Sequence, residues 1–137
     1  MNKFIQLFLR IALSAGFLSA VADRLGLYPA EISVWGNMNA FLQYTQSMMP
    51  WAPAAVIPFM GWTATILEII FGICLLLGLK TKLFAQLSGI LLLIFGLTML
   101  VAFGFKTPLD YSVFAASAAA FALSTMKGEF FELDQIK

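Results

Sequence analysis

Four long apolar stretches constrain this chain more than any other feature of its sequence. They cover residues 4–22, 58–79, 83–103 and 109–126, and each approaches the roughly 20 residues that a helix needs to cross a bilayer. A spanning segment must satisfy its own backbone hydrogen bonds, and these continuous runs are too long for barrel strands. The sequence therefore predicts an all-α fold, in which residues 1–137 form one integral membrane domain, a four-helix antiparallel bundle.

The composition agrees with a chain built for lipid and excludes several kinds of function. Charged residues make up only 11% of the chain and hydrophobic residues 61%, whereas a soluble domain carries roughly 25% charged residues. The net charge of +1 gives no electrostatic footprint for nucleic acid. The chain has no histidine and a single cysteine, Cys74, which excludes histidine triads, histidine-ligated metals and a redox dithiol pair. We therefore expect the lipid bilayer as a partner, and neither nucleic acid nor a metal.

The distribution of basic residues predicts the orientation in the membrane. With the N-terminus inside, the cytoplasmic side carries Lys3, Lys80, Lys82, Lys127 and Lys137. The opposite side carries only Arg24 and Lys106. Cytoplasmic loops hold the excess of Lys and Arg, so we expect both termini in the cytoplasm. The start of the chain also has features of a secretory signal, but Arg10 in the middle of its apolar stretch favours a retained span.

The outer connection, residues 23–57, is long and rich in aromatic residues and proline. A short amphipathic outer helix at about residues 37–49 is predicted from helical spacing of Met38, Phe41, Leu42, Thr45, Met48 and Met49. No charged residue occurs between Glu31 and Glu68, so we expect this helix to lie in the interface or to cover the bundle end. The elaborated outer side is either an aromatic belt over a closed bundle or a ligand or partner site that opens outward.

Polar residues inside the first two spans form two stripes at helical spacing. The stripes consist of Gln6, Arg10 and Ser14 in the first span, and of Gly61, Thr65, Glu68 and Gly72 in the second. The rise per residue places Arg10 and Glu68 at different depths, so Ser14 matches Glu68 better. Arg10 either extends to the inner head groups or belongs to a polar site. Glu68 is either a neutral, hydrogen-bonded carboxyl or a group that handles a proton or a polar ligand head.

A second polar group is predicted at the outer end of the bundle. Its members are Asp23, Arg24, Lys106, Asp110 and Tyr111. Asp110 follows Pro108 in the expected first turn of the fourth span, where an acidic side chain complements the helix dipole. Ion pairs of Asp23 with Lys106 and of Arg24 with Asp110 would close the bundle, and a ligand site beside the aromatic connection is the alternative.

Several polar strings resemble the DoxX family of small four-helix bacterial membrane proteins. They are residues 17–26 (FLSAVADRLG), 35–37 (WGN), 44–45 (YT), 64–68 (ATILE) with Gly72 and 75–78 (LLLG), and 106–114 (KTPLDYSVF). The last string is the most specific, and together the strings cover nearly the whole chain. The resemblance implies a multi-pass protein of the bacterial cytoplasmic, or inner, membrane.

Members of that family are linked to quinone-coupled sulfur oxidation, as the small subunit of thiosulfate:quinone oxidoreductase, and to oxidative-stress complexes. Related proteins handle disulfides with paired cysteines, which this chain lacks, so thiol–disulfide exchange does not carry over. The resemblance implies six candidate functional residues whose chemical roles are not settled: Asp23, Arg24, Glu68, Lys106, Asp110 and Tyr111. Arg10 and Tyr44 complete the set of candidate ligand-binding residues.

Two functions of different classes follow. The first is a quinone- or small-ligand-binding accessory subunit of a membrane redox system, in which Arg24, Lys106 or Tyr111 hydrogen-bonds quinone oxygens and Glu68 exchanges protons. This function requires a redox partner protein, because the chain has no redox centre of its own and quinone is the one cofactor expected. The second is a non-enzymatic transporter, lipid-handling or assembly subunit. The sequence leaves open whether an enzyme is involved and whether the chain forms a homo-oligomer.

Overall fold

The computed structural model describes residues 2–127, and all regular structure in this range is helical. The elements are α1 (Asn2–Arg24), α2 (Met38–Met48), the single 3-10 turn η1 (Ala54–Val56), α3 (Ile57–Leu77), α4 (Thr81–Phe103), α5 (Lys106–Asp110) and α6 (Val113–Thr125). The all-α prediction is confirmed. The segments Asn2–Arg24, Ala54–Leu77 and Thr81–Phe103 are long and apolar enough to cross a membrane.

The fourth predicted span is not a single long helix. Its residues divide between α5 and α6, with Tyr111 and Ser112 between them. Ser112 has a left-handed backbone conformation (φ 55°), which an α-helix cannot continue through. Asp110 therefore ends α5 and does not occupy the first turn of a long helix, so its predicted dipole role is wrong. α6 has 13 residues, about 20 Å of helix against the roughly 30 Å of a bilayer core.

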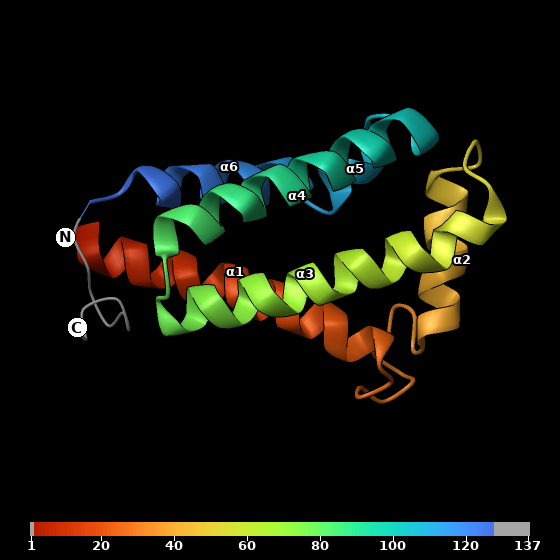
Figure 1. Cartoon of the computed structure of the whole chain (residues 1–137), viewed down its shortest axis with the longest axis horizontal. Helices are drawn as coiled ribbons and strands as arrows, with labels where there is room; N and C mark the ends of the chain where they lie inside the picture. Colours follow the sequence, from red (N-terminus) through yellow and green to blue (C-terminus); the bar gives the residue numbers. More distant parts are fainter. Residues whose placement is uncertain (1, 128–137) are drawn as a thin grey trace.

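The longer helices form two pairs that diverge toward one end of the molecule. α1 packs along α3, and α4 packs along α6. Figure 1 shows α3 and α4 close together at the turn that joins them and well separated at their other ends, where α2 lies across the gap. We call these the Lys80 end, after a residue of the turn, and the α2 end.

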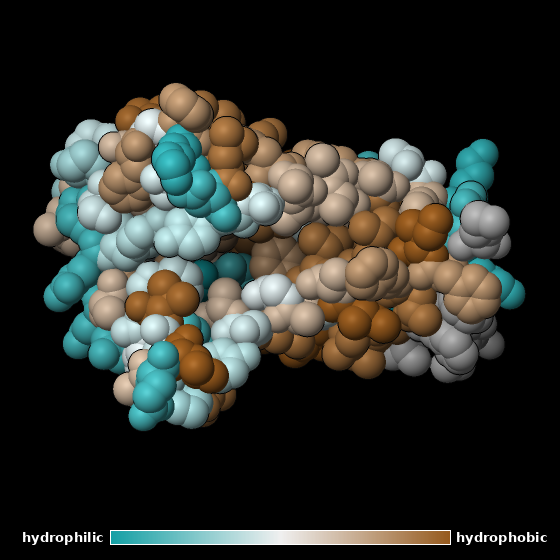
Figure 2. Space-filling model, turned by 180° about the vertical axis from the view of Figure 1, so that it is seen from behind, coloured by the Kyte–Doolittle hydropathy of each residue, from teal (hydrophilic) through white to brown (hydrophobic). Residues whose placement is uncertain are grey.

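Glycine lets the paired helices approach closely. A Cβ atom at Gly72 of α3 would lie 2.9 Å from Leu18 of α1, and one at Gly96 of α4 would lie 2.6 Å from the Phe114 ring of α6. Small residues at such positions are typical of helix contacts in membranes. The outward faces of the helices remain apolar, and Figure 2 shows hydrophobic surface along the body of the molecule with hydrophilic residues gathered toward both ends.

The predicted helix in the connection is confirmed as α2. The Asn37 side chain caps it by accepting a hydrogen bond from the Ala40 N–H at 2.8 Å, as short polar residues do at helix starts. Its buried residues are Phe41, Thr45 and Met48. These side chains face the gap between the two helix pairs, so α2 covers that gap.

Candidate functional site

Asp23 fixes the connection that leads from α1 to α2. Its buried carboxylate accepts hydrogen bonds from the backbone N–H groups of Val34 at 2.7 Å, Trp35 at 3.1 Å and Gly36 at 2.8 Å. Gly36 has a left-handed backbone (φ 81°), which glycine adopts without strain. These contacts place Trp35 beside the end of α1. The predicted ion pair of Asp23 with Lys106 is wrong, because the Asp23 carboxylate instead accepts hydrogen bonds from the backbone of the connection.

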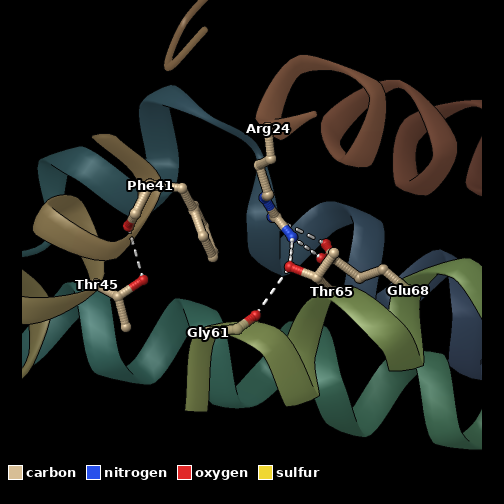
Figure 3. A network of polar contacts seen from close by, with 6 residues as sticks. All are labelled: Arg24, Phe41, Thr45, Gly61, Thr65 and Glu68. Atoms are coloured by element: carbon tan, nitrogen blue, oxygen red, sulfur yellow. Dashed lines mark hydrogen bonds and ion pairs between the residues drawn. The ribbon is translucent and has the colours of Figure 1, made fainter. Parts of the chain in front are cut away.

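The neighbouring residue, Arg24, enters the space between the helices and forms an ion pair with Glu68 of α3 (Figure 3). Arg24 Nη1 also donates to Thr65 Oγ1 at 3.0 Å, and Nη2 donates to Glu68 Oε1 at 3.3 Å. The Thr65 hydroxyl donates in turn to the Gly61 carbonyl at 2.8 Å, so its oxygen is available as an acceptor. The Arg24 and Glu68 side chains are only 3% and 4% exposed. The stripe predicted on the second span thus supplies the acceptor side of a buried polar site.

Two aromatic rings lie against the guanidinium. The Arg24 Cζ atom lies 3.7 Å from the centroid of the Phe41 ring and 5.2 Å from that of Trp35, distances at which a cation is attracted to a ring face. The two rings meet edge to face at 5.1 Å. Within residues 2–127, the buried Arg24 Nε has no hydrogen-bond partner. One donor of this site is therefore unused.

Tyr44 extends the aromatic group toward α4. Its ring lies 6.1 Å from Trp35 and 5.9 Å from Phe103. Burial raises the pKa of the Tyr44 phenol, and nearby Tyr111 raises that pKa further. The phenol therefore stays protonated at physiological pH and can donate a hydrogen bond.

A cavity of about 320 Å³ is lined by residues of α2, α3 and α4. Its walls include Phe41, Thr45, Met48, Gly61, Leu67, Leu91, Phe95 and Thr98. Two of its hydroxyls bond within their own helices, Thr45 to the Phe41 carbonyl at 2.9 Å and Thr98 to the Ile94 carbonyl at 2.7 Å. The walls therefore present mainly apolar surface, and the volume lies at the lower end of the range of small-molecule sites.

Arg10 and Ser14 lie elsewhere and do not reach Glu68. Arg10 is buried, and its Nε and Nη2 donate to the carbonyls of Leu75 at 2.9 Å and Leu76 at 3.1 Å. These carbonyls belong to the last turn of α3, where the Leu75 carbonyl also accepts from the Gly78 N–H at 3.3 Å. Arg10 therefore binds a helix end and does not extend to head groups. Ser14 was expected to match Glu68, but its buried Oγ has no hydrogen-bond partner within residues 2–127.

The remaining candidates lie on the surface at the α2 end. Lys106 pairs with Asp110 at 2.7 Å, and their side chains are 78% and 57% exposed. Tyr111 is 62% exposed. The predicted pair of Arg24 with Asp110 is therefore wrong. The five polar residues expected at one mouth are divided between a buried site and the surface.

The sequence analysis missed the partner of Glu68 because it compared Glu68 only with Arg10 and Ser14 and assigned Arg24 to the outer end of the bundle. Helical side chains lean toward the N-terminus of their own helix. Arg24 of α1 therefore leans toward the Lys80 end, and Glu68 of α3 leans toward the α2 end, so the two side chains approach each other. This rule and the length of arginine are compatible with the pair, but the offset between α1 and α3 decides that the two side chains meet. Nothing in the sequence indicated that Phe41 would contact the guanidinium.

No known protein family, curated protein or solved structure matches this chain. The resemblance to the DoxX family thus stays a prediction from the polar strings. Within the part of the chain that the structure describes, no group of three His, Cys, Asp or Glu residues could hold a metal ion. The site as built offers a buried cation, a carboxylate and an apolar cavity.

Proposed function

We propose that this protein is a multi-pass protein of the bacterial cytoplasmic membrane that binds a quinone or a similar membrane-soluble ligand, as an accessory subunit of a redox system. The observation that carries this proposal is the apolar cavity of about 320 Å³, because its wall residue Phe41 also contacts the guanidinium of the buried Arg24–Glu68 pair. A quinone combines an apolar body with carbonyl oxygens that accept hydrogen bonds. The cavity suits the first part, and the Arg24 guanidinium suits the second.

The cavity is placed for a ligand that arrives through lipid. Its walls include Phe59 of α3 and Ile94 of α4, which are 74% and 53% exposed on the long apolar helices. A molecule dissolved in the hydrocarbon therefore meets the cavity between α3 and α4 without crossing a polar surface. This geometry favours a lipid-soluble ligand over a charged one from the aqueous phase.

The polar groups suggest how such a subunit would contribute to redox chemistry. Reduction of a quinone to a quinol takes up two electrons and two protons. Both electrons and one of the protons must come from a partner protein. Arg24 orients the ligand oxygen and stabilises negative charge on it, and Glu68 beside it relays a proton.

In this proposal the α2 end faces the periplasm and the Lys80 end faces the cytoplasm. Lys3, Lys80 and Lys82 are exposed near the Lys80 end, where α1 also begins (Figure 1). Lys137 and the C-terminus lie outside the described residues. The packing argues against the alternative of a polar passage, because Leu13, Phe17, Phe71 and Leu75 fill the core between Glu68 and the Lys80 end.

The proposal is tested by quinone binding to the purified protein in lipid nanodiscs. We expect retained quinone after purification and saturable binding of a short-chain quinone. Leu91→Trp, which fills the cavity, should abolish both, whereas Leu93→Trp on the exposed face of α4 should change neither. Absence of retained quinone together with non-saturable uptake, equal to that of empty nanodiscs, would overturn the proposal. Retained phospholipid that the Leu91→Trp variant loses would instead favour lipid handling.

A further inference from the structure

Phe41 belongs to both the cavity and the charged site. Its ring lines the cavity, lies 3.7 Å from the Arg24 Cζ atom and is 4% exposed. Figure 3 shows the ring beside the guanidinium, on the side away from Glu68. In this arrangement, an apolar group in the cavity meets the ring before it reaches the guanidinium.

The buried Arg24 guanidinium has one N–H donor without an acceptor, although its terminal nitrogens are hydrogen-bonded. Glu68 and Thr65 accept from its terminal nitrogens, while the buried Nε has no partner within residues 2–127. An unmade bond from a buried donor is costly. The Phe41 ring covers the guanidinium face but offers no lone pair to this N–H. This N–H lies in the plane of the guanidinium, so a ligand oxygen that reaches the edge of the group would satisfy it.

We propose that the cavity and the Arg24–Glu68 pair are two halves of one amphiphile-binding site, and that the Phe41 ring closes the path between them when no ligand is bound. The apolar body of the ligand fills the cavity. Its head displaces the ring, and Arg24 exchanges a cation–π contact for a hydrogen bond, which is the stronger interaction for a charged donor. This inference rests on the proposed function, because it requires that the cavity binds a ligand.

Charge balance defines the class of head group. Glu68 already neutralises Arg24 within the buried site. A carboxylate head would place two negative charges on one cation, and its desolvation would not be compensated. The site therefore favours an uncharged head that accepts hydrogen bonds, such as a carbonyl, over both a plain hydrocarbon and an anion.

Three probes with the same decyl tail test this inference in nanodiscs at pH 7: a decyl benzoquinone, decylbenzene and 4-decylbenzoate. We expect the benzoquinone to bind about tenfold more tightly than decylbenzene, because the hydrogen bond to the charged donor outweighs the cation–π contact that it replaces. The benzoate should bind no better than decylbenzene. Equal affinities for the benzoquinone and decylbenzene, or tighter binding of the benzoate, would overturn the two-part site and leave the cavity function intact. If no probe binds saturably, the proposed function itself fails.

Variants of Phe41, Arg24 and Glu68 test which residues produce the preference for the benzoquinone over decylbenzene. Phe41→Ala removes the ring that must move, so the ratio of benzoquinone to decylbenzene affinity should rise about tenfold, consistent with a lost cation–π contact of about 1–2 kcal/mol. Phe41→Leu should raise it less, and Phe59→Ala, another ring of the cavity wall, should leave it unchanged. Arg24→Gln/Glu68→Gln removes both charges together and should reduce the ratio to about one. An unchanged ratio in folded Phe41→Ala and Phe41→Leu proteins would refute the role of the ring, whether or not the double variant folds.

Discussion

Asp23 and Arg24 are adjacent in the sequence, yet they organise different parts of the molecule. Successive residues of a helix point about 100° apart, so one side chain faces the connection and the other faces α3. Asp23 binds three backbone N–H groups of residues 34–36, whereas Arg24 binds Thr65 and Glu68. Asp23 and Arg24 together therefore couple the position of the connection to the buried site of Arg24 and Glu68.

Replacing Asp23 by Asn should loosen the connection. The amide keeps the shape but loses the negative charge and one acceptor, so the three N–H groups lose part of their bonding, at a cost of about 1–3 kcal/mol. Hydrogen exchange of residues 34–40 should accelerate, and the melting temperature should fall. Asp110→Asn, at an exposed pair, is the control and should change stability by less than about 0.5 kcal/mol. Unchanged exchange in the Asp23 variant would contradict the assigned role.

Glu68→Gln should destabilise the protein more than its conservative shape suggests. It leaves the Arg24 charge buried without a counter-ion, which costs about 3–5 kcal/mol. The double variant Arg24→Gln/Glu68→Gln should recover much of the loss, because no charge remains. Denaturant unfolding of the two single variants and the double variant provides the cycle, with Glu31→Gln on the exposed connection as the control. A single Glu68→Gln protein as stable as the unaltered one would show that the pair is not the ionic contact described.

At the scale of the element, glycine decides how closely the helices pack. A Cβ atom at Gly96 would lie 2.6 Å from the Phe114 ring, whereas one at Gly16 would meet nothing within 4 Å. We expect Gly96→Ala to separate α4 from α6 and to cost about 1–3 kcal/mol. Gly16→Ala should cost nothing, because alanine favours helix. Thermal unfolding in the same detergent compares the two, and equal melting temperatures would contradict the close packing of this pair.

At the scale of the whole molecule, the two helix pairs diverge at the α2 end, and α2 and the cavity occupy the resulting gap. The proposed orientation places that end in the periplasm. In a Cys74→Ser background, Val34→Cys should react with an impermeant maleimide on intact cells. Lys82→Cys should react only after the membrane is opened. The reverse pattern of labelling would invert the topology.

The sequence by itself determined which segments become helices and which faces they bury. Apolar runs of bilayer length define α1, α3 and α4, and helical spacing located α2 close to its observed bounds. The polar stripes were also readable, since Gln6, Arg10, Thr65 and Glu68 are all buried. These properties are local, because they depend on periodicity within one element and on the free-energy cost of exposing polar groups to lipid.

Only the tertiary structure decided which polar groups meet. The pairing of Glu68 with Arg24 depends on the offset between α1 and α3 and on the lean of both side chains, which no single segment encodes. The division of the fourth span depends on the backbone of one residue, Ser112 (φ 55°). The contact of Phe41 with Arg24 exists because Asp23 fixes the connection and α2 spans the diverging helices. Contacts between distant segments follow from how the helices pack against one another, and that packing is settled by the whole chain at once.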